Sequence, residues 1–124
     1  MQDHKIKVLY VEDDPSLAEL LRAGLGLFGM VVHPVYCSSE ELLAKSNSPD
    51  FAKADILFLD IRLPGLTGLE LAKMLRSRGE KRPIVIVSAY NRPDSATLEE
   101  LGAAFQPKPF DFDEIVHVVQ SLLK

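Results

Sequence analysis

Short apolar runs alternate along the chain with longer stretches in which apolar residues keep helical spacing. The runs at residues 56–59 and 83–88 are almost continuously apolar between turn residues, which is typical of strands buried on both faces of a sheet. Three more strands are predicted at residues 6–11, 30–36 and 103–106. Strand and helix would then alternate five times, which predicts an α/β fold with a parallel sheet and right-handed crossovers.

Capping residues and apolar spacing define the five predicted helices. The starts of the first four are marked by Asp14-Pro15, by Ser38–Glu41, by Thr67–Glu70 and by Asp94. The last helix has one apolar face between residues 112 and 123. Residues 47–50 are expected to form a loop between the second helix and the third strand.

The length and composition are those of one globular domain, which we expect to span residues 1–124. Apolar residues make up 47% of the chain, and the net charge of −4 is dispersed without the basic stripe that nucleic-acid binding needs. No run is long enough for a membrane span, and the amino terminus lacks the apolar core of a signal peptide. Cys37 is the only cysteine, so no internal disulfide can form, and we expect it to pack at a strand end in a cytoplasmic protein.

Two familiar patterns do not fit their usual function. Residues Gly24–Gly29 match the dinucleotide-binding pattern G-x-G-x-x-G, but that chemistry needs the glycines between a strand and the start of a helix. Here they close a predicted helix, so we expect no nucleotide site. The histidines His4, His33 and His117 share no ligand spacing, which argues against a zinc site.

Polar side chains with complementary chemistry follow four of the predicted strands. They are Glu12 and Asp13 after the first strand, Asp60 after the third, Ser88 after the fourth and Lys108 after the fifth. Strand order 2-1-3-4-5 would join the first and third strands where open α/β sheets bind ligands. Converging carboxylates favour a cation, and oxygen ligands suit Mg²⁺. With Lys108 and Ser88 nearby, Asp60 could attack a phosphoryl group in line.

Together these motifs resemble the receiver domain of two-component response regulators, and the resemblance covers essentially the whole chain. Residues 11–15 (VEDDP) resemble its acidic pocket and residues 59–68 (LDIRLPGLTG) its phosphoacceptor loop. Ser88-Ala89 matches the switch hydroxyl, and Lys108-Pro109-Phe110 matches the lysine motif, whose Lys-Pro bond is typically cis. The resemblance implies a flavodoxin-like doubly wound sheet of five parallel strands in the order 2-1-3-4-5, with two helices on one face and three on the other.

The resemblance also implies what the site does. Asp60 would accept a phosphoryl group from a histidine kinase or a phosphotransfer protein, and the domain would catalyse this transfer and its own slow dephosphorylation. The ligands implied for Mg²⁺ are Asp13, Asp60, the backbone carbonyl of Arg62 and, through water, Glu12.

The implied output is a change of surface. Ser88 and the aromatic Phe105 would switch the face formed by residues 94–102, the strand at 103–106 and the last helix, which a downstream protein partner would read. Arg62 and Tyr90 flank the pocket, and we expect them to shield the phosphoryl group and prolong its lifetime.

Other functions stay open at this point. A phosphorylation-independent interaction module on the same fold is the main alternative, although such a module need not keep all five pocket residues. A nucleotide- or flavin-binding enzyme would rest only on fold analogy and the glycine pattern. Asp60 taken alone could be an ordinary strand-end aspartate solvated by its loop. The last helix lacks the arginines common in the DNA-binding winged-helix subgroup, so we expect no direct nucleic-acid binding.

Overall fold

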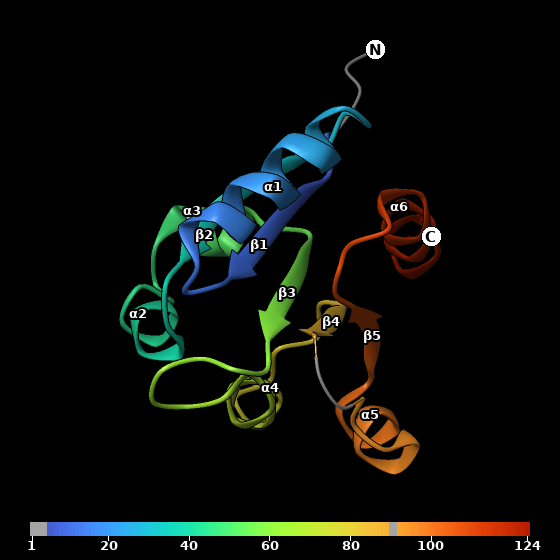
Figure 1. The fold of residues 1–124 in the computed structure, drawn as a ribbon. Coiled ribbons are helices and arrows are strands. Elements are labelled where there is room, and N and C mark those ends of the chain that lie inside the picture. Colours follow the sequence, from blue (N-terminus) through green and yellow to red (C-terminus); the bar gives the residue numbers. More distant parts are fainter. Residues whose placement is uncertain (1–4, 90–91) are drawn as a thin grey trace.

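A computed structural model describes residues 5–89 and 92–124, and its centre is a five-stranded parallel sheet (Figure 1). The strands are β1 (Lys7–Val11), β2 (Val31–Tyr36), β3 (Ile56–Asp60), β4 (Ile84–Ser88) and β5 (Ala103–Pro107). They lie in the order β2-β1-β3-β4-β5, and every neighbouring pair is parallel. The predicted α/β fold and strand order are therefore confirmed.

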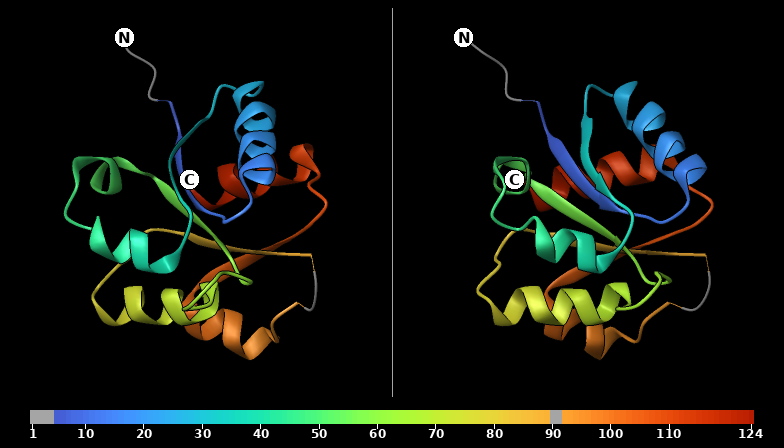
Figure 2. Two further views of the ribbon diagram at one scale, coloured as in Figure 1. Left: turned by 60° about the vertical axis from the view of Figure 1, so that its left-hand side comes forward. Right: turned by 90° about the vertical axis from the view of Figure 1, so that its left-hand side faces the viewer.

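Six helices within the described residues cover the two faces of the sheet. They are α1 (Pro15–Gly26), α2 (Ser39–Ala44), α3 (Pro49–Lys53), α4 (Gly68–Ser77), α5 (Ser95–Leu101) and α6 (Phe112–Leu122). α1 and α6 lie on one face, and the other four lie on the opposite face (Figure 2). None of the helices in the described ranges has the length and apolar content to cross a membrane.

The prediction of five helices was wrong by one, because α3 occupies part of the expected loop at 47–50. Its start carries ordinary helix signals: Pro49 takes the first position, and the Ser48 hydroxyl accepts the Phe51 N–H at 3.3 Å. The helix has only 5 residues, too few to show an apolar period. The four-helix face therefore has one helix more than the three expected.

The strands divide their side chains between two apolar cores, because successive residues of a strand point to opposite faces. In β3, Ile56 and Phe58 belong to the core under α1 and α6, whereas Leu57 and Leu59 belong to the core under the other helices. Every residue of β3 and β4 is buried, as expected for central parallel strands. This burial continues to the carboxyl end of β3, where Asp60 lies.

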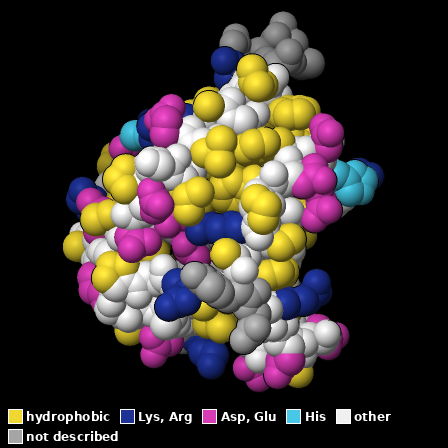
Figure 3. All heavy atoms as spheres, viewed as in Figure 1, with side chains coloured by type: hydrophobic (Ala, Val, Ile, Leu, Met, Phe, Trp, Pro, Cys, Tyr) yellow, Lys and Arg dark blue, Asp and Glu magenta, His cyan; other side chains and the backbone are white. Residues whose placement is uncertain are grey.

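The glycine pattern of α1 has an explanation in packing. A Cβ atom at Gly24 would lie 2.2 Å from Cε1 of Phe112 in α6, so only glycine lets this ring approach the helix. Gly29 follows α1 with a φ of 81°, the left-handed conformation that ends helices. Hydrophobic side chains gather over the region between α1 and α6 (Figure 3). Gly24 and Gly29 therefore serve helix packing and the end of α1, and the pattern does not form a nucleotide-binding loop.

The edge strand β2 is irregular and corrects one prediction. Its register with β1 shifts at Pro34, which has no N–H to donate to the ladder, and the His33–Pro34 peptide is cis. At the end of β2 the buried position belongs to Tyr36, and the alternation of strand side chains turns Cys37 outwards. The expectation that Cys37 packs at the strand end was wrong, because Cys37 is one residue out of phase with the buried Tyr36.

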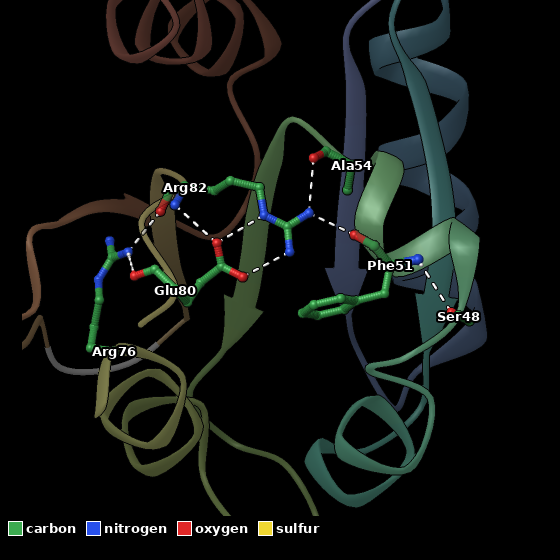
Figure 4. A network of polar contacts seen from close by, with 6 residues as sticks. All are labelled: Ser48, Phe51, Ala54, Arg76, Glu80 and Arg82. Carbon is green, nitrogen blue, oxygen red and sulfur yellow. Dashed lines mark hydrogen bonds and ion pairs between the residues drawn. The ribbon is translucent and has the colours of Figure 1, made fainter. Parts of the chain in front are cut away.

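Arg82 holds together the elements at the amino end of β4 (Figure 4). Its guanidinium donates to the backbone oxygens of Phe51 and Ala54 at 2.6 and 2.9 Å, and it binds both oxygens of the Glu80 carboxylate. The same group lies 4.6 Å from the centroid of the Phe51 ring. Hydrogen bonds from Arg82 hold the pKa of the Glu80 carboxyl below its usual value, although burial acts in the opposite direction. Arg82 thus fixes α3 against the start of the central strands.

Arg76 makes a second set of backbone contacts beside this one. It donates to the carbonyls of Glu80 and Arg82, each at 2.8 Å, and to those of Leu101 and Gly102 at 2.6 and 3.1 Å. The last two carbonyls end α5, so a charged donor satisfies groups that a helix terminus leaves unpaired. Both arginines thus make their contacts near the amino end of β4.

Candidate functional site

The predicted pocket residues come together at the carboxyl ends of the strands. β1 and β3 are neighbours, and their register pairs Val11 with Leu59, so the residues that follow these two face each other across the end of the sheet. Carboxylate oxygens of Glu12, Asp13 and Asp60 all lie within 4.8 Å of one another. This is the arrangement that the strand order predicted.

The three carboxylates differ in their exposure to solvent. Glu12 and Asp60 are buried, with 3% and 4% of their surface exposed, whereas Asp13 is exposed. Asp14 stays outside the cluster, because its side chain caps α1 by accepting the Ser16 N–H at 2.8 Å. Two acids are therefore fixed inside the pocket, and a third closes it from the solvent side.

Lys108 bridges the two buried acids. Its Nζ lies 2.7 Å from Oε1 of Glu12 and 2.7 Å from Oδ2 of Asp60, and only 10% of its side chain is exposed. Burial lowers the pKa of Lys108, but the hydrogen bonds and charges of Asp60 and Glu12 outweigh burial and raise it above its usual value. The ammonium therefore stays charged at neutral pH and is held where the carboxylates meet.

The backbone on both sides of Lys108 is fixed as well. Its N–H donates to the carbonyl oxygen of Ser88 at 2.9 Å, which extends the pairing of β4 and β5. The Lys108–Pro109 peptide is cis, as the resemblance implied. The backbone hydrogen bond thus places Lys108 at the carboxyl end of the sheet, where its side chain contacts Asp60.

Tyr10 is a pocket residue that the sequence analysis overlooked. Its Oη donates to Oε1 of Glu12 at 2.8 Å, the same oxygen that Lys108 binds. Burial raises the pKa of the Tyr10 hydroxyl well above its usual value, and the Glu12 charge raises it further, so the group remains a donor. The sequence feature that could have revealed this residue is the alternation of side chains along a strand, which puts residues 10 and 12 on the same side of the sheet.

The loop after Asp60 approaches the strand end very closely. A Cβ atom on Gly68 would lie 2.0 Å from the carbonyl oxygen of Asp60, so glycine is required where α4 begins. Thr67 and Glu70 form the predicted capping box, which fixes this start. The Arg62 N–H points to Oδ1 of Asp60 at 3.4 Å. The loop therefore packs against the backbone of Asp60 and directs one backbone N–H, that of Arg62, at its carboxylate.

The two predicted switch residues lie at different depths. Ser88 is buried, with 2% of its surface exposed, at the carboxyl end of β4. Phe105 in β5 is partly buried beside α5, with the guanidinium of Arg92 5.5 Å from its ring centroid. Both Phe105 and Arg92 line an open groove of about 540 Å³ between α5, β5 and the end of α6. Phe105 therefore lies on β5, the strand that leads to Lys108, and also lines a surface groove.

Of the two residues expected to affect phosphoryl lifetime, Arg62 is exposed on the loop after Asp60. Tyr90 lies outside the described residues, so its position relative to Asp60 stays a prediction. Asp60, Glu12, Asp13 and Lys108 are brought together as expected.

Comparisons with known proteins assign the chain to a family. The model of the response regulator receiver domain matches residues 8–120, and the chain belongs to this family. Receiver domains of response regulators take phosphoryl groups from kinases. The family resemblance inferred from the motifs is therefore confirmed.

The individual relatives are named as transcriptional or response regulators. The DNA-binding transcriptional regulator NtrC of Salmonella typhimurium is 35% identical over 116 residues, which are 91% of this chain and 24% of NtrC. The response regulator MprA of Mycobacterium ulcerans is 32% identical over 122 residues, 96% of this chain and 50% of MprA. The chain thus spans half or less of these relatives. The solved structure of chemotaxis protein CheY4 of Vibrio cholerae matches with a TM-score of 0.81 at 26% identity, over 97% of this chain and 100% of that one.

Proposed function

We propose that residues 1–124 form one receiver domain in which Asp60 accepts a phosphoryl group from the phosphohistidine of a histidine kinase or phosphotransfer protein. The observation that carries this proposal is the contact of a buried aspartate with a lysine whose side chain is only 10% exposed, beside two further carboxylates. A solvated strand-end aspartate would not need such surroundings, because it would be exposed to water and free of a buried cation.

The transfer itself is a displacement at phosphorus. An oxygen of the Asp60 carboxylate attacks in line, the P–O bond forms, and the P–N bond to the donor histidine breaks, leaving its electron pair on the imidazole nitrogen. Lys108 would turn its ammonium from Glu12 and Asp60 to the phosphoryl oxygens, which gain negative charge. Burial of Asp60 excludes bulk water from this side of the reaction.

The pocket fits Mg²⁺ in charge and in donor type. Three carboxylates and one ammonium leave two negative charges, which one divalent cation balances. All side-chain donors in the cluster are oxygens, as this hard cation prefers. We propose that Asp13, Asp60 and the Arg62 carbonyl bind it directly and Glu12 through water. When bound, it neutralises charge on the transferring group.

Phosphorylation of Asp60 would change the conformation of a surface of the protein. We infer that Ser88 donates to a phosphoryl oxygen and that Phe105 turns inward, which changes the face formed by α5, β5 and α6. Moving such a switch from 1:99 to 99:1 takes roughly 5.5 kcal/mol. One hydrogen bond to a charged group supplies about 1.5–3 kcal/mol, so Lys108 must contribute as well. A protein partner would bind the groove beside Phe105.

This region is proposed to act in the cytoplasm through protein contacts. NtrC is named as DNA-binding, but the aligned part is only 24% of that protein. The described surface offers no basic stripe on α6, whose first turn is acidic. A phosphorylation-independent interaction module is the alternative. The two ion pairs of Lys108 with Glu12 and Asp60 argue against it, since such a module has no need for a cation held between two buried acids.

Phosphorylation by a small donor tests the proposal. The protein is incubated with acetyl phosphate, with Mg²⁺ or with a chelator, and its intact mass is measured. We expect one added phosphoryl group that requires Mg²⁺, is lost in Asp60→Asn and persists in Asp55→Asn, a control at the other end of β3. Asp13→Asn should raise the Mg²⁺ concentration needed. Full labelling of Asp60→Asn would reject the assignment of the acceptor.

A further inference from the structure

The hydroxyl of Tyr10 has a contact that packing does not explain. Tyr10 is fully buried, and its ring meets Phe58 edge-on with the centroids 6.4 Å apart. A phenylalanine would fill the same space and keep this ring contact. The hydroxyl adds only the 2.8 Å hydrogen bond to Glu12. Any effect of the Tyr10 hydroxyl must therefore act through the Glu12 carboxylate.

Glu12 is held at both of its oxygens. Oε1 accepts from Tyr10 and from Lys108, at 2.8 and 2.7 Å, while Oε2 accepts the backbone N–H of Asp14 at 3.2 Å. Two of these three donors are fixed, because one is backbone and the other is a buried ring. The third is a flexible ammonium that the transfer reaction would draw to the phosphoryl group.

We propose that Tyr10 is a positioning residue for Glu12, whose carboxylate it keeps oriented towards the cation site after Lys108 has turned away. This inference rests on the proposed function, because it assigns Glu12 to Mg²⁺ and Lys108 to the phosphoryl group. Without the Tyr10 hydroxyl, Oε1 would lose its fixed donor and the carboxylate could rotate about its side-chain bonds. Glu12 would then contribute less to cation binding, although the fold would be the same.

The expected effect of Tyr10→Phe is weaker binding of Mg²⁺. Loss of a hydrogen bond that orients a metal ligand typically lowers affinity about 10–100-fold, and we expect about tenfold because Glu12 is assigned an indirect contact. Saturating Mg²⁺ should restore phosphorylation by acetyl phosphate, because neither Asp60 nor Lys108 is altered. The defect should thus lie in cation affinity and not in the transfer step.

The experiment is an NMR titration with magnesium chloride, following the amide signals around Asp60. It compares the unmodified protein with Tyr10→Phe and with Tyr36→Phe, a buried tyrosine on the neighbouring strand β2 that belongs to the other core. The Kd for Mg²⁺ is also measured in Glu12→Gln and in the double variant that carries Tyr10→Phe and Glu12→Gln. Urea unfolding of each variant shows that the protein titrated is folded.

The proposal is supported if the Kd for Mg²⁺ rises in Tyr10→Phe, stays unchanged in Tyr36→Phe, and does not rise further when Tyr10→Phe is added to Glu12→Gln. An unchanged Kd in Tyr10→Phe overturns it, and so does an equal rise in the Glu12→Gln background, which would indicate a general structural effect. Failure of the proposed function looks different: the unmodified protein itself would bind no Mg²⁺ or accept no phosphoryl group.

Discussion

Removing the ammonium of Lys108 should destabilise the metal-free protein. Lys108→Met keeps the side chain as far as the ε position but removes the ammonium, which leaves the Glu12 and Asp60 carboxylates without their shared cation, although their side chains are only 1% and 6% exposed. Taking away one partner of a buried ion pair typically costs about 3–5 kcal/mol. Because Tyr10 and a backbone N–H still bind Glu12, we expect the lower end, about 3 kcal/mol.

Mg²⁺ should offset this loss. Without the lysine, the three carboxylates face no competing positive charge, so Lys108→Met should bind the cation more tightly than the unmodified protein does. A ligand at 100 times its Kd stabilises a folded protein by about 2.7 kcal/mol. The variant should therefore approach normal stability in Mg²⁺ while remaining impaired in phosphorylation.

Urea unfolding followed by circular dichroism, with a chelator and with Mg²⁺, measures both effects. The matched control is Lys45→Met, since Lys45 is 56% exposed in an i,i+4 pair with Glu41 and its loss should leave the free energy of unfolding nearly unchanged. Adding Asp60→Asn to Lys108→Met should regain stability by removing one uncompensated charge. A Lys108→Met protein as stable as the control in chelator would refute the bridging function of the lysine.

Four other variants test separate parts of the molecule. Ser88→Ala should reduce the amide shifts that beryllofluoride causes at α5, β5 and α6 while phosphorylation continues; full-size shifts there would exclude Ser88 from the switch. The lowered pKa of Glu80 means that its pair with Arg82 stabilises the fold fully above about pH 4.3 and less as the pH falls through the lowered pKa. Glu80→Gln should therefore cost more stability near pH 6 than near pH 3 in urea unfolding, and equal costs would contradict this sign. Arg62→Asn and Tyr90→Glu should each speed the decay of phosphorylated protein after the donor is removed, because they remove shielding; slower decay would show that these side chains assist hydrolysis.

The sequence predicted the parts of the fold that depend on local pattern and on strand order. The buried run ending in Asp60 and the alternation of elements were enough to bring Glu12, Asp13 and Lys108 to one end of the sheet. Parallel strands fix this geometry, because their carboxyl ends meet at the same edge. The position of the pocket therefore follows from the strand order alone, without knowledge of side-chain contacts.

Features that depend on exact contacts could not be derived in this way. The helix α3 has too few residues for its apolar period to be visible, and Cys37 was misplaced because one residue of phase reverses a strand side chain. Arg82 reaches the Phe51 carbonyl across 31 positions of the chain, a pairing that no local pattern reveals. The hydroxyl of Tyr10 was overlooked because a buried aromatic residue in a strand is ordinary for packing alone.

Locating the phosphoryl group on the chain tests the central claim most directly. Protein treated with acetyl phosphate and Mg²⁺ is reduced with borohydride, which converts a phosphorylated aspartate to homoserine, and is then digested with trypsin. The peptide Ala54–Arg62 contains both Asp55 and Asp60, and fragment ions between them distinguish the two. We predict homoserine at position 60 alone, and only in samples that contained Mg²⁺. Homoserine at position 55, or modification of another peptide with residue 60 intact, would contradict the account.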